Sequence, residues 1–263
     1  MPTIAQSTRK ERRDAARRER MEREAALAAA ATRRRRLIRL GAVLGVAVLV
    51  VAVLIAVSTS GSGTKTATRA APSGPVAGAR ESTAMLSGIP QDGIVLGDPK
   101  APVRVIEFAD LQCPFCRDYT LNTMPRLVQD YVRPGKVRME FRTLAFIGAD
   151  SERAARVAQA AAQQNKLWNV VDLAYFNQGK ENSGWATDAL LKRIAGAVPG
   201  LDADRVFAAR DGAAVTGALK SAATLATSSG VQSTPTFLVG RGSQLKAVDA
   251  AGLPAAIKAA VGR

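Results

Sequence analysis

The sequence predicts an α/β domain with a helical insertion, preceded by a single transmembrane helix and a flexible linker. An apolar segment near the N-terminus is long enough to cross a bilayer. A strand–helix–strand pattern begins near residue 103, and a long helical stretch separates it from two more strands and a closing helix. The expected division is a basic tail over 1–36, an anchor over 37–57, a linker over 58–88 and a folded domain over 89–263.

The N-terminal tail carries much of the positive charge of the chain. Residues 1–40 hold 13 Lys and Arg against 5 Asp and Glu, which is +8 of the formal +15. The tail has good helix formers and charge pairs at i,i+4 spacing, but no aromatic side chain lies among the charges. A nucleic-acid-binding surface is therefore not expected, and the tail reads as a solvated cytoplasmic segment beside a membrane.

The anchor is predicted from an uninterrupted apolar run. Residues 40–57 contain no charged side chain, and the span 37–57 covers about 31 Å as a helix, which matches a bilayer core. It is longer than the usual apolar region of a signal peptide, so an uncleaved anchor is favoured. The arginine run before it places the N-terminus in the cytoplasm and the chain after Ser58 outside.

A tether is expected between the anchor and the domain. Residues 58–88 are rich in Ser, Gly, Thr, Ala and Pro and show no hydrophobic period. As a flexible coil such a segment would have a root-mean-square span of about 30 Å. The domain that follows is long enough to bury one substantial core without a stapling disulfide.

The domain begins with a strand–helix–strand unit. The β-branched and apolar run 103–109 predicts a buried strand, 114–132 predicts a helix whose first residue is a proline, and the alternating segment 137–141 predicts a second strand. The crossover between parallel strands is expected to be right-handed.

A helical insertion of about 149–229 follows, with apolar residues at helical spacing. Within it, helices are expected at 187–198, with Thr187 as N-cap, and at 202–228, with a break near Gly212 or Gly217. Trp168, Tyr175 and Trp185 are interpreted as core rather than as the lining of a groove. Strands at 236–239 and 244–248 and a helix at 253–261 complete the domain.

The two cysteines of the chain, Cys113 and Cys116, form a Cys-Pro-Phe-Cys motif, and three readings compete. A structural zinc site needs four Cys or His ligands, but the chain has two cysteines and no histidine. A structural disulfide here would close a very short loop and constrain the unfolded chain least. A redox dithiol is therefore the favoured interpretation, with no metal and no cofactor beyond the Cys113–Cys116 disulfide.

The predicted position of the motif suits redox chemistry. Cys113 lies where a strand meets a helix, so unpaired backbone N–H groups and the helix dipole would stabilise its thiolate. Pro114 fits the first helical turn without loss of a needed N–H group. Cys116 would be shielded one turn further along and would resolve the mixed disulfide formed by Cys113.

With these motifs, the domain resembles the DsbA-like thiol:disulfide oxidoreductases of the thioredoxin-like superfamily over nearly all of 89–263. VIEFADLQCPFC looks like the family's strand-to-redox-helix segment, with Glu107 as its acidic residue. STPTFLVG looks like its cis-proline segment, which would make Pro235 the cis residue beside the dithiol and Thr234 its variable neighbour. The helical insertion also distinguishes this family from plain thioredoxin.

The alternatives for the neighbouring residues stay open at this point. Pro235 can be an ordinary trans proline and Glu107 a surface residue of a strand. Asp110 and Arg117 are expected to face solvent, and Gln112 is expected to be a loop residue without a role. One departure from the family is Phe115, which stands where oxidases of this family often carry a thiolate-stabilising histidine.

The resemblance implies a membrane-anchored, extracytoplasmic enzyme that passes its disulfide to exported proteins with thiols and is regenerated by a membrane oxidase. Two alternatives remain. A disulfide reductase or isomerase would use the same residues in the opposite direction, and a non-redox membrane-tethered binding or chaperone module would carry the dithiol incidentally.

Overall fold

A computed structural model describes residues 74–262 of the chain. The predicted tail and anchor, over 1–57, lie outside the described residues, as does the linker up to residue 73. Within 74–262, no helix combines the length and the apolar character that a membrane crossing requires.

One mixed β-sheet of six strands forms the centre of the domain, in the order β1-β2-β4-β3-β5-β6. Its middle pair, β3 and β4, runs parallel, and every other neighbouring pair is antiparallel. The strand bounds are β1 (Gln91–Asp92), β2 (Val95–Leu96), β3 (Val103–Asp110), β4 (Val137–Leu144), β5 (Thr236–Arg241) and β6 (Gln244–Val248).

The predicted strands are confirmed, and β3 and β4 extend further than the sequence pattern indicates, to Asp110 and Leu144. These extra residues lie opposite each other in the parallel register. The short β1–β2 hairpin was not predicted, because two-residue strands carry no recognisable alternation.

The helix that connects β3 to β4 is continuous but not uniform. It consists of α3 (Pro114–Asp118), the π-helical turn η1 (Tyr119–Thr123), α4 (Met124–Leu127) and a second π-helical turn, η2 (Val128–Val132). Pro125 lies in the middle, and its missing N–H and its ring are incompatible with an ordinary α-helical bond at that point. The predicted helix over 114–132 is therefore confirmed, with a π-helical distortion around the proline.

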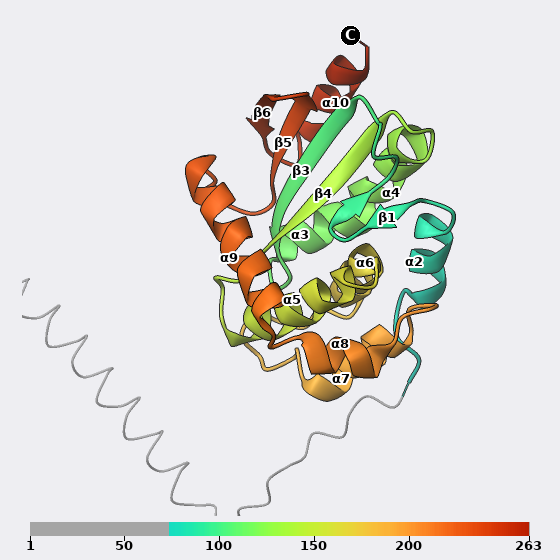
Figure 1. Cartoon of the computed structure of the whole chain (residues 1–263), viewed down its shortest axis with the longest axis vertical. Coiled ribbons are helices and arrows are strands. Elements are labelled where there is room, and N and C mark those ends of the chain that lie inside the picture. Colours follow the sequence, from blue (N-terminus) through green and yellow to red (C-terminus); the bar gives the residue numbers. More distant parts are fainter. Residues whose placement is uncertain (1–73, 263) are drawn as a thin grey trace, which may run out of the picture. The chain divides into compact units, whose positions relative to one another are not determined.

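The remaining helices are α5 (Ala149–Ala162), α6 (Leu167–Phe176), α7 (Asp188–Gly196), α8 (Ala203–Ala209), α9 (Ala213–Ser228) and α10 (Leu253–Val261). Thr187 caps α7, as predicted, by accepting a hydrogen bond from the Leu190 N–H. The break between α8 and α9 falls at Gly212, which is the N-cap of α9. Figure 1 shows α5 to α8 gathered at one end of the sheet, and α3 contacts α6.

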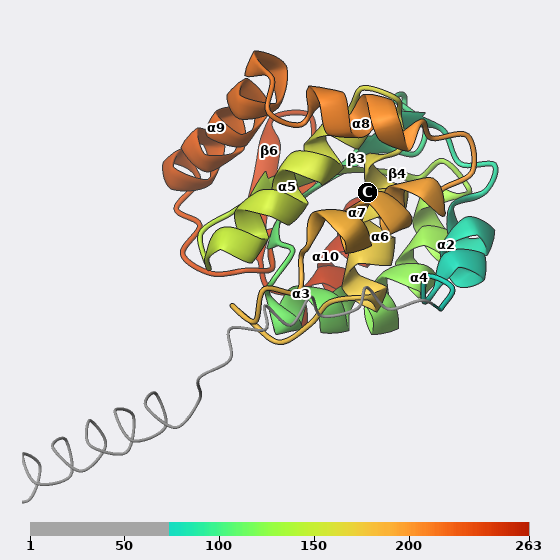
Figure 2. The same cartoon turned by 90° about the horizontal axis from the view of Figure 1, so that it is seen from below.

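Two layers of apolar side chains cover the two faces of the sheet. On one face, α3, α6 and α10 pack on Val105, Phe141 and Phe237, and Cys116 of α3 is part of this layer. On the other, α9 packs on Ile106 and Phe108, and Figure 2 shows α9 on the outer side of α5. The aromatic side chains of the insertion are core, as interpreted from the sequence: Trp168, Tyr175 and Trp185 are all buried.

One boundary from the sequence was wrong. Helix α2 (Ala79–Leu86) lies within the segment 58–88 that was predicted to be flexible linker, and it packs on α6 with Ser82 and Leu86 buried. Arg133 donates hydrogen bonds to the carbonyl oxygens of Met85 and Ser87 at the end of α2. The helix is short and weakly apolar, so its stability comes from these contacts rather than from its own sequence.

Candidate active site

The two cysteines lie at the carboxyl end of β3, where the chain turns into the connecting helix. Cys113 is the N-cap residue of α3, with extended backbone angles, and Pro114 is the first helical residue. The Cys113 N–H donates to the Asp110 carbonyl oxygen, and the Cys113 carbonyl oxygen accepts from the Arg117 N–H of the first helical turn. Both cysteines are free thiols. Cys113 keeps 5% of its surface exposed and Cys116 none.

The cis-proline segment lies directly beside Cys113. The Thr234–Pro235 peptide bond is cis. The Cys113 thiol donates a hydrogen bond to the carbonyl oxygen of Thr234, with Sγ and O 3.3 Å apart. Pro235 is buried and Thr234 is half-buried, so the backbone before the proline borders the sulfur from the side opposite the helix.

The surroundings give the two thiols opposite acidities. A hydrogen bond from the Cys116 thiol, together with the Thr234 side chain and the N–H groups of Cys116 and Phe115, outweighs the effect of burial and lowers the pKa of Cys113 to about 6. Burial, followed by the interaction with Cys113, raises the pKa of Cys116 far above its ordinary value. At neutral pH, Cys113 is therefore mostly a thiolate and Cys116 a thiol.

Glu107 is buried beneath the dithiol rather than exposed on the strand. Its side chain is fully enclosed on β3, and neither carboxyl oxygen has a hydrogen-bond partner among the described residues. Desolvation by burial raises the pKa of Glu107 to about 8. The ionised carboxylate would also raise the pKa of Cys116. The surface alternative considered for Glu107 is therefore wrong, because its side chain points to the face of the sheet that the redox helix covers.

Phe115 points into solvent. With 72% of its surface exposed, it is one of two large apolar side chains that are exposed within 74–262; the other is Phe146, at 62%, in the loop after β4. Phe115 follows β3, and Phe146 follows β4. Both segments start at the same end of the sheet, because the last residues of the two strands, Asp110 and Leu144, are paired. An exposed phenylalanine thus stands between the two cysteines, and its side chain, unlike its backbone N–H, supplies no hydrogen bond or charge to the thiolate.

The expectation that Asp110 faces solvent was wrong. Asp110 is fully buried and accepts hydrogen bonds from the Gln112 N–H, the Ser151 hydroxyl and the N–H groups of Phe146 and Ile147. Its carboxylate thereby ties the loop of Cys113 to the loop after β4. A local sequence pattern does not reveal the burial of Asp110. Three of its four hydrogen-bond donors come from the loop after β4 and the start of α5, about 40 residues further along the chain.

Gln112 is also more than a loop residue. It is buried, donates to the Ser151 hydroxyl and accepts from the Asn182 N–H. Gln178 reaches the same loop and donates to the carbonyl oxygens of Leu111 and Cys113. The segment after α6 therefore holds the backbone around Cys113 in place, a role that sequence reasoning missed. Arg117 faces solvent, as expected, while donating to the Tyr175 carbonyl oxygen.

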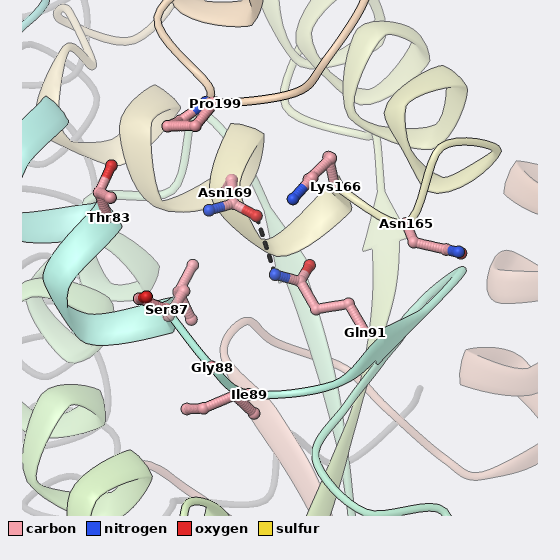
Figure 3. Close-up of a pocket in the computed structure, with 10 residues that line it drawn as sticks. Thr83, Ser87, Gly88, Ile89, Gln91, Asn165, Lys166, Asn169 and Pro199 are labelled. Carbon is pink, nitrogen blue, oxygen red and sulfur yellow. Dashed lines mark hydrogen bonds between the residues drawn. The ribbon is translucent and has the colours of Figure 1, made fainter.

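A pocket beside the first turn of α6 does not belong to the dithiol. It measures about 330 Å³ and lies between α2, β1 and the first turn of α6 (Figure 3). Gln91 donates a hydrogen bond to Asn169 across it. None of the residues predicted as site residues lines this pocket.

Comparisons with known proteins agree with this geometry. The thioredoxin family model matches residues 90–259. A probable disulfide bond formation protein D of Bacillus cereus is 41% identical over 101 residues, which are 38% of this chain and 47% of that protein. The chain thus spans about half the length of the curated relatives it matches.

Solved structures show the same fold. BdbD from Bacillus subtilis, in its oxidised form, has a TM-score of 0.58 at 23% identity, with 66% of this chain and 98% of that chain covered. Wolbachia pipientis alpha-DsbA1 has a TM-score of 0.54 at 23% identity, with 67% and 92% covered. At these identities the likeness concerns the thioredoxin-like α/β fold with its helical insertion.

Proposed function

The chain belongs to the DsbA-like family of thioredoxin-fold proteins, and we propose that it is a thiol:disulfide oxidoreductase that donates its disulfide to exported proteins. The observation that carries the proposal is the opposite acidity of the two thiols. Cys113, with a pKa of about 6, is a stable thiolate and hence a good leaving group, whereas Cys116 is held as a buried thiol. Stabilising the thiolate favours the reduced enzyme and therefore the transfer of the disulfide to a substrate.

The transfer proceeds in two exchange steps. A substrate thiolate attacks Cys113 Sγ of the oxidised enzyme, the bond between Cys113 and Cys116 breaks, and a mixed disulfide forms. The second substrate thiolate then attacks the substrate sulfur of that bond and releases the Cys113 thiolate. Two electrons pass from the substrate to the enzyme. Of the two substrate protons, one ends on Cys116 and the other reaches solvent.

Glu107 handles the proton of the buried cysteine in this scheme. When Cys116 leaves, its sulfur carries a charge in a desolvated position, which is costly. The Glu107 carboxyl group is protonated at pH 7, because its pKa is about 8. Since neither of its oxygens bonds to Cys116 directly, it would pass a proton to Cys116 through an intervening water and regain one released by the substrate. In the reverse direction it accepts the proton of Cys116.

Cys113 would be the attacked cysteine and Cys116 the resolving one, with Pro114 shaping the first turn and Phe115 facing the substrate. Thr234 and Pro235 border the Cys113 sulfur and would lie along the substrate. No metal and no cofactor other than the Cys113–Cys116 disulfide is proposed.

The proposal extends to location and partners. A membrane anchor over 37–57, a cytoplasmic tail over 1–36 and a tether that ends before α2 would hold the domain over 89–263 outside the membrane. There it would meet thiol-containing exported proteins, and a membrane oxidase would regenerate its disulfide. The support is the arginine-rich, apolar N-terminal sequence and the likeness to a probable disulfide bond formation protein.

Equilibration of the protein with glutathione redox buffers tests the direction of transfer. A reduction potential more oxidising than about −200 mV would fit a disulfide donor, and a value near −270 mV would fit a reductase instead. A non-redox binding module is tested by the same titration, because it would show no reversible two-electron exchange at Cys113 and Cys116.

A further inference from the structure

A second pocket lies between α2, η1 and α6, away from the sulfur atoms. It measures about 230 Å³, and most of its wall is apolar; it is lined by Glu81, Met85, Thr120, Leu121, Pro125, Asp172 and Phe176. Pockets of drug-sized ligands are larger, so this one suits a single side chain or a small molecule. Its polar groups are few, and all of them are oxygens.

The carboxylate in this pocket has no counter-charge. Asp172 lies on α6 with 2% of its surface exposed, and its Oδ2 has no hydrogen-bond partner within residues 74–262. Desolvation raises the pKa of Asp172 to about 6, and no neighbouring cation opposes the rise. A buried carboxylate without a partner is costly for the fold, and buried charges in proteins are normally paired.

Two hydroxyl groups near Asp172 also lack partners. Thr120 on η1 lines the same pocket, and its Oγ1 is buried without a hydrogen bond in the described part of the chain. Ser82 on α2 is buried, and its Oγ is likewise unpartnered. It lies beside Asp172 and lowers the pKa of that carboxyl group, but it does not line the pocket. Asp172 and Thr120, from α6 and η1, thus each bring one unsatisfied oxygen to the wall of this pocket.

The other groups of the pocket favour a cation with an apolar body. Glu81 is exposed at its edge and adds a second negative charge, while Phe176 offers an aromatic ring. By contrast, the pocket of Figure 3 contains Lys166, and its Gln91 and Asn169 side chains bond to each other. A desolvated carboxylate without a cation is therefore a feature of the α2–η1–α6 pocket and not of its neighbour.

We infer that the α2–η1–α6 pocket binds a primary alkylammonium group, either of a free amine or of a lysine side chain, with Asp172 and Thr120 as its acceptors. An ammonium group has three N–H donors, two of which these unsatisfied oxygens would accept. Its methylene chain would lie against Met85, Leu121 and Phe176. A divalent metal is a poorer fit, because residues 74–262 contain no cluster of three or more metal-binding side chains. The inference is independent of the redox function.

The test is a binding titration of the full-length chain in amine-free phosphate buffer. n-Butylammonium should bind saturably and shift the NMR methyl signals of Met85 and Leu121. Tetramethylammonium, which has the charge but no N–H donor, should bind at least about tenfold more weakly, since the hydroxyl and carboxylate oxygens would stay unpaired.

Variants identify the site. Asp172→Asn keeps the shape of the side chain and removes a buried charge, so it should fold, and it should weaken butylammonium binding at least about tenfold. Asp130→Asn is the control. Asp130 is an exposed carboxylate on η2, in the helical connection that also carries Thr120, and it does not line the pocket, so this variant should leave binding unchanged. Equal binding by wild type and Asp172→Asn, no saturable binding, or equal binding of tetramethylammonium would each overturn the inference.

Two peptides distinguish the source of the ammonium group. A short lysine peptide that competes with butylammonium, when its acetyl-lysine counterpart does not, would assign the pocket to a protein side chain. Competition by the free amine alone would assign it to a small molecule. Neither result depends on the redox state of Cys113. A chain that binds no ammonium group could still donate disulfides, and a chain that donates no disulfide could still bind an ammonium group.

Discussion

The Cys113 sulfur lies 3.3 Å from the carbonyl oxygen of Thr234, a residue 121 positions further along the chain. This contact places the thiolate between the start of its own helix and the backbone before Pro235. A substrate sulfur that attacks Cys113 would therefore meet both segments at once. Cys116 is fully buried, whereas Cys113 keeps 5% of its surface exposed, and this difference divides the roles of the two thiols.

The division of roles predicts different trapping by two serine variants. Cys116→Ser should leave Cys113 able to form mixed disulfides but unable to release them through the neighbouring thiol, so adducts with exported proteins should accumulate on non-reducing gels. Cys113→Ser should trap none, because Cys116 is fully buried. Equal trapping by both variants would reverse the assignment, and trapping by neither would favour the binding module.

The low pKa of Cys113 predicts a pH-dependent gap between the stabilities of the reduced and the disulfide forms. The folded pKa, about 6, is depressed from an ordinary 9.0, so the stabilisation of the reduced form is complete above pH 9 and is lost as the pH falls through 6. Raising the pH from 5 to 7 should favour the reduced form by no more than about 1.4 kcal/mol, or about 30 mV.

Urea titrations of both forms at pH 5 and pH 7 measure this gap. The short disulfide loop stabilises the oxidised form by about 2 kcal/mol at either pH. The test is therefore the change with pH in the difference between the two unfolding free energies, and not which form is the more stable. A gap that does not move would mean that Cys113 is an ordinary thiol.

Glu107→Gln is expected to stabilise the fold and slow the chemistry. The pKa of Glu107 is raised from 4.5 to about 8, so its contribution to stability is full below pH 4.5 and is lost as the pH rises through 8. Removing the ionisable group should therefore add roughly 1 to 3 kcal/mol to the unfolding free energy at pH 7. Loss of the proton donor to Cys116 should slow disulfide transfer about 100-fold.

Glu140→Gln is the matched control for that variant. Glu140 lies on the neighbouring strand, but it pairs with Arg104 and Arg142, which together outweigh burial and lower its pKa. Removing this charge should destabilise the fold and leave transfer by Cys113 unchanged. A stability loss in both variants would mean that Glu107 is also paired.

Phe115→His should make the dithiol more oxidising. Phe115 is mostly exposed, so an imidazole fits there without disturbing the core, and its positive form would lower the pKa of Cys113 below 6. Each unit by which the pKa of Cys113 falls should raise the reduction potential by about 30 mV. Thiolate absorbance and glutathione equilibria measure the two effects. Phe146→His, at the other exposed phenylalanine, should change neither; similar shifts in both variants would point to a general charge effect.

The proposed topology is checked with protease on intact spheroplasts. If the arginines before residue 37 hold the N-terminus in the cytoplasm, the protease should digest the C-terminal domain and spare the tail. Protection of the domain would place the dithiol in a reducing compartment, where a donated disulfide does not persist.

Local pattern determined the elements of this domain. The β-branched and apolar run 103–109 predicted β3, and Thr187 predicted the start of α7. A break was expected near Gly212 or Gly217, and it falls at Gly212. These signals succeed because strand pattern, helix capping and helix breaking each depend on residues only a few positions apart in the chain. The Cys-Pro-Phe-Cys motif and the Ser-Thr-Pro-Thr segment likewise pointed to the pieces of the redox site before their contact was known.

Burial of polar groups was decided only by tertiary structure. Asp110 was expected in solvent, yet it is enclosed because the loop after β4 and helix α5 close over it. The same holds for Glu107 and Asp172, which no pattern marks as buried. Helix α2 is ordered by α6 and Arg133 rather than by its own sequence. The physical reason is common to all of these: the environment of a charged side chain is set by elements distant in sequence, whereas the elements themselves are set by their neighbours in the chain.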